Sequence, residues 1–441
     1  DVYKRQKYDE AIQADRKAAT LQPENARFHS NLLLTLNYLP SLSQEEFLNE
    51  HKRWDALHSI NVLSQKYSNP VDPDRRLRIG YLSPDFRTHS VAYFFEPLLQ
   101  NHDNNAVETY CYACTPHCDE TTKRLQSKSN HWSNITAMDD RQAIAKIKSD
   151  GIDILVDLSG HTAKNRLVVM SGKPAPIQMN WLGYPATTGL ASIDYKVTDG
   201  IADPAGSEIY YTEQLIRLPG CFLCYTPPLD TPSVAPSPAE ENGFITFGSF
   251  NNMAKINELV IKLWSELLYK LPDSRILIKN PSLTDKATAE RYVSIFRHYG
   301  VNESRVELLG LAPSTYEHLQ TYNRIDIALD TFPYNGTTTS CEALYMGVPV
   351  ITYAGETHAG RVGSSILTAL DLGEYIASSQ DDYIAIAARL AGNKARLTEL
   401  RNDLRLRMAK SPLTDGRAFA RKMEQTYRTI WQAYCSPGRN I

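Results

Sequence analysis

From Leu77 onward, short runs of β-branched and aromatic residues alternate with amphipathic stretches of helical period, and this alternation restricts the possible folds most. It is typical of β-α-β units, in which helices connect and cover parallel strands. One set of runs predicts strands at 77–82, 108–113, 152–158, 177–182 and 195–198. A second set predicts strands at 244–247, 275–278, 306–309, 327–329 and 348–352. The sequence therefore predicts an α/β chain with two similar halves.

A proline-rich stretch at 226–240 separates the two sets, and its proline density prevents regular structure. We therefore expect a helical segment over 1–70, an N-terminal half over 75–235, a C-terminal half over 241–410 and terminal helices over 411–441. In doubly wound sheets, ligands bind outside the carboxyl ends of the strands. The chemistry is expected in those loops, in a cleft shared by the two halves.

The first residues have the pattern of a repeat. Aromatic, small and proline residues are spaced as in the second helix of a tetratricopeptide repeat of about 34 residues. These residues are Tyr8, Ala11, Ala18 and Pro23. The next segment has Leu33 in place of the expected glycine, so the array is expected to end there. Because so few repeats cannot stand alone, we expect the end of a longer solenoid or a helical cap, with an ordinary helical hairpin as the alternative.

Composition excludes several classes of protein. Forty-seven basic against 50 acidic residues give a net charge of −3, so the chain lacks the positive field that nucleic acids or anionic membranes attract. No apolar run approaches the ~20 residues of a spanning helix, and the first residues are not typical of a signal peptide. Seven cysteines are too few for a disulfide scaffold. We expect a cytoplasmic protein with neither nucleic-acid nor membrane partners.

Two Cys-x-x-Cys pairs raise the question of a zinc site: Cys111 with Cys114, and Cys221 with Cys224. Both pairs lie in strand-like runs, where a spacing of three directs the two thiols to opposite faces. We therefore expect buried structural cysteines. No P-loop, nucleophile elbow or zinc-protease signature is present in the sequence. The Asp-x-Asp at 72–74 precedes the first strand, so we expect no metal cofactor and a diphosphate neutralised by protein groups.

Residues 330–342 form the strongest candidate for binding phosphate. A strand end leads through Gly336 into a helix expected to begin near Thr339, and a helix N-terminus carries about half a positive charge and unpaired amides. The three hydroxyls there belong to Thr337, Thr338 and Thr339. Glu342, one turn inside, suits a ribose. The alternative is a threonine-capped helix after a turn.

Lys255 is the second candidate, in or beside the first turn of an amphipathic helix. A cation is unfavourable at that end of the helix dipole unless it shares an anion, which indicates a phosphate-binding lysine. A solvated surface lysine is the alternative. Arg361 lies among the glycines of 354–363, which permit close backbone approach to a phosphate, although simple turn glycines are equally consistent.

Two histidines occupy strand-end loops. His89 precedes a helix that Ser90 is expected to cap, and His161 occupies the equivalent loop after a later strand. An imidazole can act as a general base or bind phosphate, so both are candidates for a position in the cleft. A lone loop histidine is more often incidental.

Taken together, these loops resemble the protein O-linked N-acetylglucosamine transferases and the SPINDLY proteins of glycosyltransferase family 41. The resemblance runs from about Arg76 to Tyr434 and includes SPDFRTHSVAYFFEPLL, DILVDLSGHTAKNRL, FGSFNNMAKI and LDTFPYNGTTTSCEALYMGVPVIT. It implies a GT-B fold, with two Rossmann-like domains facing a cleft, preceded by tetratricopeptide-like helices. It also implies metal-independent transfer with inversion.

The resemblance implies a role for each matching position. Lys255 holds the donor diphosphate, Asn252 stands where the transferases have glutamine, and the three threonines cradle the phosphates. His318 lies near the base or ribose, Glu342 stands where an aspartate contacts the ribose, and His89 matches a cleft histidine proposed as general base.

The implied function is transfer of N-acetylglucosamine from UDP-N-acetylglucosamine to Ser or Thr of acceptor proteins, which the repeat helices present. GDP-fucose is the alternative donor, because blocks such as FNNMAKI and YNGTTTSCEALYMGVP are more similar to plant SPINDLY. Two further alternatives are an inactive scaffold and an enzyme acting on lipid or small-molecule acceptors.

Overall fold

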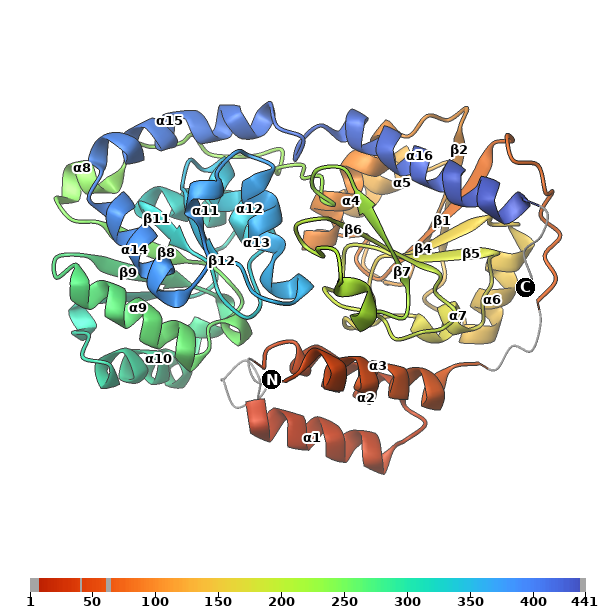
Figure 1. Cartoon of the computed structure of the whole chain (residues 1–441), viewed down its shortest axis with the longest axis horizontal. Helices are drawn as coiled ribbons and strands as arrows, with labels where there is room; N and C mark the ends of the chain where they lie inside the picture. The colour runs from red at the N-terminus through yellow and green to blue at the C-terminus, as the bar shows by residue number, and fades with distance from the viewer. Residues whose placement is uncertain (1–7, 40–41, 61–64, 437–441) are drawn as a thin grey trace. The chain divides into compact units, whose positions relative to one another are not determined.

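The computed structural model describes residues 8–39, 42–60 and 65–436 and divides into two compact units (Figure 1). The unit that we call the C-terminal unit consists mainly of Pro227–Leu413, with two short segments from the beginning of the chain. The N-terminal unit consists of Ile12–Leu36, Ser41–Thr226 and the chain from Thr414. The division falls at the beginning of the proline-rich stretch, where proline prevents pairing into a sheet.

Three helices precede the first sheet: α1 (Tyr8–Leu21), α2 (Ala26–Leu36) and α3 (Gln44–His58). Helix α3 begins with a capping box, in which Ser43 accepts from the Glu46 amide and the Glu46 carboxylate accepts from Ser43. Helices α2 and α3 pack together, and the buried Trp54 indole donates to the carbonyl of Ala26 at 3.1 Å.

The N-terminal unit contains a seven-stranded parallel sheet of order β3-β2-β1-β4-β5-β6-β7. Its strands are β1 (Leu77–Ser83), β2 (Val107–Ala113), β3 (His131–Asn134), β4 (Ile154–Asp157), β5 (Ile177–Asn180), β6 (Tyr195–Asp199) and β7 (Gln214–Leu218). Its further helices are α4 (Ser90–Asn101), α5 (Glu120–Lys128), α6 (Asp140–Ser149), α7 (Leu167–Ser171) and η2 (Ser207–Tyr210). The five predicted strands are confirmed, whereas β3 and β7 were not predicted.

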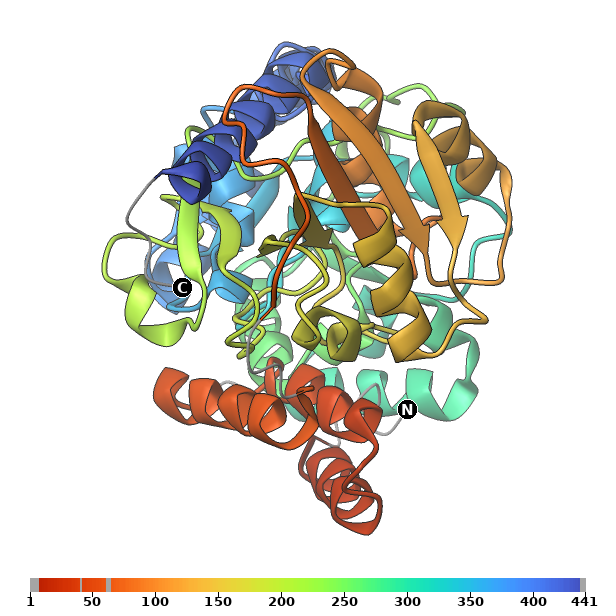
Figure 2. The ribbon, with the colours of Figure 1, turned by 90° about the vertical axis from the view of Figure 1, so that its right-hand side faces the viewer.

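The last helix, α16 (Gly416–Cys435), also belongs to the N-terminal unit. It packs against α4 (Figure 2), and the Tyr427 hydroxyl lies 3.1 Å from that of Tyr81 on β1. Its inward face holds the predicted stripe of Met423, Tyr427, Ile430 and Trp431, all buried. The chain therefore returns to its first sheet after completing the second.

The C-terminal unit contains a six-stranded parallel sheet of order β10-β9-β8-β11-β12-β13. Its strands are β8 (Thr246–Ser249), β9 (Arg275–Lys279), β10 (Val306–Leu309), β11 (Ile327–Leu329), β12 (Val350–Tyr353) and β13 (Ile376–Ala377). The five predicted strands are again confirmed, and the two-residue β13 was not predicted.

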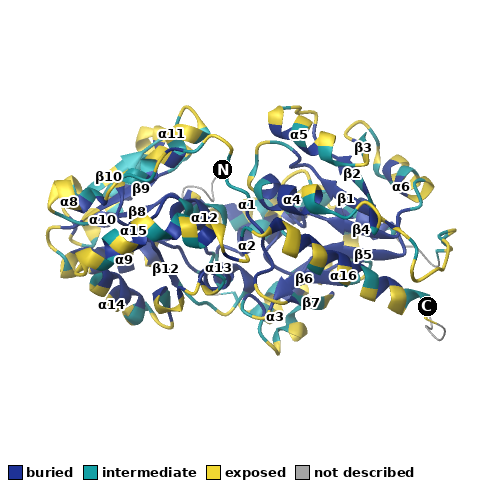
Figure 3. Cartoon of the chain, turned by 90° about the horizontal axis from the view of Figure 1, so that it is seen from above, coloured by how far each residue is buried: buried dark blue, intermediate teal, exposed yellow. Residues whose placement is uncertain are grey.

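The helices of this unit connect and cover these strands. They are α8 (Pro238–Asn242), η3 (Met253–Lys255), α9 (Glu258–Lys270), η4 (Pro281–Thr284), α10 (Lys286–His298), η5 (Glu303–Arg305), α11 (Thr315–Gln320), η6 (Thr321–Arg324), α12 (Thr338–Tyr345), η7 (His358–Gly360), α13 (Val362–Thr368), η8 (Gly373–Tyr375), α14 (Gln380–Ala391) and α15 (Lys394–Ala409). In both units the strands are mainly buried and the exposed residues lie mainly on outer helix faces (Figure 3). Among the described residues, no helix is both long and apolar enough to cross a membrane.

Candidate functional site

The order of strands in the C-terminal sheet points to one place for a ligand. The chain moves outward from β8 to β10 in one direction and then from β11 to β13 in the other, so the direction reverses between β8 and β11. In open α/β sheets, ligands bind outside the carboxyl ends of the strands at such a switch point. Here those ends lead into residues 250–257 and 330–337, the two segments that the sequence indicated.

Lys255 is the last residue of η3, and its side chain reaches the second segment. Nζ donates a hydrogen bond of 2.7 Å to the carbonyl of Asn335 and lies 3.8 Å from the ring centroid of Tyr334. Burial lowers the pKa of Lys255 to about 8, while the nearby Asp330 acts in the opposite direction. The ammonium is therefore held two residues before Thr337, with part of its hydration shell removed.

Asp330 fixes the shape of the loop that receives Lys255. Its buried carboxylate accepts hydrogen bonds from the amide of Gly336 at 2.6 Å, the amide of Thr331 at 2.8 Å and the hydroxyl of Thr352 at 2.8 Å. Burial raises the pKa of Asp330 to about 6, against the effect of these hydrogen bonds. Asp330 was not predicted to have this role, although it directly follows the predicted strand at 327–329.

Helix α12 begins one residue earlier than predicted, with Thr337 as N-cap. Thr337 and Thr338 are partly exposed, and their hydroxyls make no hydrogen bond to any described residue. Thr339 differs, because its hydroxyl donates to the side-chain oxygen of Asn251 at 2.9 Å. The first amides of a helix have no intrahelical acceptor, so this end offers backbone donors beside two unoccupied hydroxyls.

Gly336 is required by close packing at this helix end. A Cβ atom there would lie 2.6 Å from Thr339 Oγ1, 2.8 Å from Asn251 Oδ1 and 2.8 Å from Ser340 Oγ. A small pocket lies at the same place, between the ends of β8 and β11 and the start of α12. Its lining includes Phe250, Asn251, Tyr322, Asp330, Thr339 and Ser340.

A second polar group lies one turn along α12. The buried Glu342 carboxylate is 3.0 Å from His318 Nε2 and accepts from the Tyr322 hydroxyl at 3.1 Å. On the other side of the imidazole, Lys279 Nζ lies 2.5 Å from His318 Nδ1. Sequence reasoning brought out His318 and Glu342 but missed Lys279. The available signal was a lysine directly after the apolar Ile-Leu-Ile centre of β9.

Asn252 and Arg361 are also positioned near these segments. Asn252 is exposed and caps η3, because its side chain accepts from the Ala254 amide at 3.1 Å. Arg361 follows η7 and donates to the Gly355 carbonyl at 3.2 Å. The loop containing Arg361 is joined to Asn335, whose amide donates to the carbonyl of Ala359 at 2.9 Å.

His89, rather than Ser90 as expected, is the residue that caps its helix. It is itself the N-cap of α4, accepting from the Val91 amide at Nδ1, and Ser90 is the first helical residue, so the prediction that Ser90 caps the helix was wrong. The carboxylate of Asp85 lies 3.7 Å from Nδ1. Burial lowers the pKa of His89, while Asp85 acts in the opposite direction. The side chain remains 37% exposed, so a ligand can reach it.

His161 does not line an open surface, contrary to expectation. It is 1% exposed, its Nε2 donates to the Thr188 carbonyl at 2.7 Å, and its Nδ1 accepts from Ser30 at 3.1 Å. The rings of His51, Trp54 and Tyr184 surround it at centroid distances of 5.2 Å each. The α2 and α3 helices cover this loop, which the strand pattern alone did not reveal.

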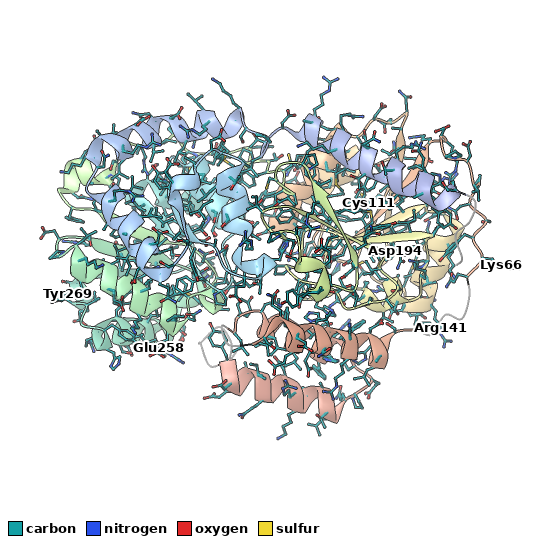
Figure 4. The ribbon with its side chains drawn as sticks, viewed as in Figure 1. Lys66, Cys111, Arg141, Asp194, Glu258 and Tyr269 are labelled. Atoms are coloured by element: carbon teal, nitrogen blue, oxygen red, sulfur yellow. The ribbon has the colours of Figure 1, made fainter. Side chains whose placement is uncertain are left out.

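The four Cys-x-x-Cys thiols are buried, as predicted; Cys111 lies on β2 of the N-terminal unit (Figure 4). Burial raises the pKa of Cys114 and of Cys224 to about 12, so these two thiols stay protonated. Within the described ranges, no group of three or more His, Cys, Asp or Glu side chains is arranged to hold a metal ion.

Solved structures are similar over nearly the whole chain. A lysine-to-methionine mutant of the O-GlcNAc transferase of Thermobaculum terrenum is 38% identical, with a TM-score of 0.93 over 98% of this chain and 83% of that one. A structure of Anabaena HepE with UDP and glucose has a TM-score of 0.51 at 10% identity, over 80% of this chain and 100% of that one, which indicates the fold alone. The predicted GT-B class of α/β fold is confirmed.

Curated proteins with similar sequences have names of the same kind as the Thermobaculum transferase. A probable UDP-N-acetylglucosamine–peptide N-acetylglucosaminyltransferase SPINDLY of Hordeum vulgare is 42% identical over 420 residues, which are 94% of this chain and 44% of the relative. The corresponding SEC protein of Arabidopsis thaliana is 33% identical over 375 residues, 82% of this chain and 38% of the relative. The chain thus spans less than half the length of these relatives. The model of glycosyl transferase family 41 matches residues 46–225 and 239–423, and the chain belongs to that family.

Proposed function

We propose that this chain is the catalytic region of a protein O-glycosyltransferase that takes a sugar from a nucleotide-sugar donor. The observation that carries the proposal is the hydrogen bond from Lys255 to the carbonyl of Asn335, which brings an ammonium group to the amino end of α12. The names of the similar proteins support the same class of reaction.

The donor diphosphate binds at this end of α12. Lys255 supplies the positive charge, the first amides of α12 and the hydroxyls of Thr337 and Thr338 supply hydrogen-bond donors, and Arg361 completes the positive side. Donors fixed before the reaction stabilise the charge that develops on a leaving diphosphate, and one such donor is worth about 3–4 kcal/mol in a known hydrolase. A Ser or Thr hydroxyl of the acceptor attacks the anomeric carbon, with inversion.

The nucleoside lies farther along α12. Glu342 uses one carboxylate oxygen for His318 and Tyr322, and the other faces the ribose hydroxyls. Both nitrogens of His318 are occupied by protein groups, so His318 contacts the nucleoside through its ring rather than through a hydrogen bond. Asn252, near Lys255 in the chain, is exposed and contacts the donor at the edge of its site.

His89 supplies a proton donor in this scheme. Because Nδ1 accepts the amide of Val91, the neutral ring carries its proton on Nε2. A neutral imidazole in that tautomer donates a hydrogen bond to a substrate oxygen, and a different group removes the acceptor proton.

UDP-N-acetylglucosamine is the donor that we propose first, in line with the names of the similar proteins. GDP-fucose is the second candidate, because the blocks FNNMAKI and YNGTTTSCEALYMGVP resemble plant SPINDLY, and this resemblance implies a SPINDLY-type protein O-fucosyltransferase as the alternative. The N-terminal helices hold the acceptor protein, and the reaction takes place in the cytoplasm.

The test compares the wild type with Lys255→Met and, as control, Lys270→Met, whose lysine is exposed at the end of α9. Thermal unfolding is followed with UDP, GDP and their sugars, since a ligand at about 100 times its Kd stabilises by about 2.7 kcal/mol. Transfer of labelled N-acetylglucosamine or fucose to protein is measured in parallel. We expect one nucleotide to stabilise the wild type and transfer to be lost only in Lys255→Met. Full transfer by Lys255→Met would contradict the proposal. A wild type that binds partner proteins but transfers no sugar would indicate a scaffold instead.

A further inference from the structure

Two tyrosines from the beginning of the chain stack on the loop that receives Lys255. The ring of Tyr38, two residues after α2, lies 5.4 Å from that of Tyr334 with an interplanar angle of 19°. The ring of Tyr8, from α1, lies 6.5 Å from Tyr38 at 26°. We call Tyr8, Tyr38 and Tyr334 the tyrosine stack. All three belong to the C-terminal unit, although 296 positions separate Tyr38 from Tyr334 (334 − 38).

The stack ends on the lysine. Lys255 Nζ lies 3.8 Å from the centroid of Tyr334, within the distance at which an ammonium is attracted to the negative face of a ring. The same Nζ donates to the Asn335 carbonyl at 2.7 Å. The Tyr334 ring and the Asn335 carbonyl together hold the Lys255 ammonium in one position. The remaining N–H groups of the ammonium stay available.

Hydrogen bonds fix the short helix that carries Lys255. The Tyr8 hydroxyl donates to the carbonyl of Ala254 at 2.6 Å, directly before Lys255. The Tyr292 hydroxyl, from α10, donates to the carbonyl of Met253 at 3.1 Å. Tyr8 therefore contacts both the backbone next to Lys255 and, through Tyr38, the ring beneath its ammonium.

Such an arrangement has a consequence for binding an anion. A flexible lysine loses side-chain entropy when it is fixed on a phosphate, and a lysine already held in place loses less. A buried ammonium also costs free energy, which the face of Tyr334 partly offsets. Neither Tyr38 nor Tyr8 lies in the catalytic sheets, yet both act on the position of Lys255.

We propose that Tyr334 and Tyr38 are positioning residues, which hold the Lys255 ammonium ready for the donor diphosphate and link the N-terminal helices to donor binding. This inference rests on the proposed function, because it requires Lys255 to bind phosphate. It adds that the helices expected to hold acceptor protein also help to set the affinity for the donor.

The main variants are Tyr334→Leu and Tyr38→Leu, which keep apolar bulk and remove the ring. The probes are UDP and GDP, with UMP and GMP as ligands that lack the second phosphate. We expect the dissociation constant of the cognate diphosphate, measured by calorimetric titration, to rise about 3- to 10-fold, in the range of a single cation–π contact. The monophosphate should change by less than about 2-fold, since the lysine is expected to address the diphosphate.

Conservative variants separate positioning from folding. Tyr334→Phe and Tyr38→Phe keep the rings and should bind within about 2-fold of the wild type. Tyr269→Leu is the matched control, because Tyr269 is 84% exposed on α9 of the same unit (Figure 4). If Tyr38→Leu does not fold, Tyr8→Phe, which removes only the hydrogen bond to Ala254, gives the same test with a smaller expected loss.

A double-mutant cycle provides the sharpest outcome. Because the stack is inferred to act through Lys255, Tyr38→Leu should weaken diphosphate binding in the wild type and have no effect in Lys255→Met. Equal losses in both backgrounds, or unchanged diphosphate binding in Tyr334→Leu, would overturn the inference. If Lys255→Met itself binds UDP and GDP as the wild type does, the proposed function fails instead. If Lys255→Met loses diphosphate binding while Tyr334→Leu and Tyr38→Leu bind as the wild type does, only the positioning role of the tyrosine stack is refuted.

Discussion

The ammonium of Lys279 lies 2.5 Å from Nδ1 of His318, and this contact determines which nitrogen of the imidazole carries the proton. An ammonium has only donors, so Nδ1 accepts, and Nε2 donates to the Glu342 carboxylate at 3.0 Å. Burial lowers the pKa of Lys279, while Glu342 acts in the opposite direction. The ring is thereby oriented from both sides at the place proposed for the nucleoside.

Lys279→Met should therefore allow His318 to exchange between its two neutral tautomers. We expect the ¹⁵N signals of its ring to move from the pure Nε2–H form toward a mixture, and nucleotide affinity to fall about 10-fold, the value of one hydrogen bond to a charged group. Histidine-labelled protein and His318→Gln, which identifies the signals, provide the measurement. Lys262→Met, at an exposed site on α9, is the control. An unchanged ring spectrum in Lys279→Met would contradict this account.

Gly336→Ala should disrupt the start of α12. The new Cβ would meet Thr339 Oγ1, Asn251 Oδ1 and Ser340 Oγ at 2.6–2.8 Å, so the hydroxyls must shift and the loop must widen. We expect a loss of about 1–3 kcal/mol in the free energy of unfolding, and weaker nucleotide binding. Gly373→Ala is the matched control, because no atom lies within 4 Å of its added Cβ, and it should stay within about 0.5 kcal/mol of the wild type in urea denaturation. Equal stability of the two variants would show that the helix end adapts freely.

Sequence periodicity predicted the buried strands well. The limits of β11 agree with the predicted 327–329, because a fully buried strand reads as a short apolar run. Those of β10 agree with the predicted 306–309, although this edge strand has no buried residue and was found from its three apolar side chains. Strand β3 was missed because its four residues, HWSN, include two exposed polar positions, and β13 has only two residues. Short or exposed strands have no periodic signal and depend on their neighbours for pairing.

The same distinction applies to the site. Lys255 and the threonines could be singled out because both follow a strand end in the local sequence, although Lys255 ends η3 and lies three residues before α9 rather than in its first turn. Lys279 and Tyr38 could not, since the first meets His318 across 39 positions and the second meets Tyr334 from the other end of the chain. His161 gave the opposite error, because helices far upstream cover it. Local rules therefore find donors and charges, whereas long-range packing decides which of them are positioned or covered.

Binding of the nucleoside diphosphate should weaken as the pH rises through 8. The pKa of Lys255 is about 8 in the free protein, so the ammonium is present below this pH and progressively lost above it. A bound anion favours the charged form, so affinity falls by up to a factor of about 10 for each pH unit above 8. Titrations at pH 7–9.5 measure the slope. Lys255→Arg, whose guanidinium stays charged, should bind with little dependence on pH over this range. A wild-type affinity that stays constant to pH 9.5 would contradict the assignment of phosphate to Lys255.

Four histidines beneath and within α2 and α3 should make the N-terminal unit sensitive to acid. His51 donates from Nδ1 to the carbonyl of Phe47 at 2.6 Å and accepts from the Tyr184 hydroxyl at 2.7 Å. His161 likewise donates once and accepts once, and His29 lies 3.3 Å from His58. His51 and His161 are each bonded as a neutral imidazole, and one ring of the His29–His58 pair must accept, so added protons remove acceptors and place charge at buried or half-buried sites.

The direction of the pH effect follows from the pKa shifts of these histidines. Burial lowers the pKa of His29 and of His51 to about 4, from 6.5 in the unfolded chain, and lowers those of His58 and His161 as well. Between pH 6.5 and 4 the folded state binds fewer protons than the unfolded state, so the free energy of unfolding decreases as the pH falls. Asp15 and Asp157 oppose this, because burial raises the pKa of both, that of Asp157 to about 6, so each gains a proton first in the folded state. Two carboxyls do not balance four imidazoles.

We therefore expect the N-terminal unit to lose stability between pH 6.5 and 4, with the change reported by the buried Trp54, whose ring centroid lies 5.2 Å from those of His58 and His161. Urea denaturation followed by tryptophan fluorescence at several pH values gives the slope. His51→Gln removes one titrating ring and should reduce that slope by about 1 proton, even if it lowers stability at neutral pH. His298→Gln, at an exposed position on α10, should leave the slope unchanged. A wild-type stability that is constant down to pH 4 would mean that the four rings accept protons without leaving their buried positions.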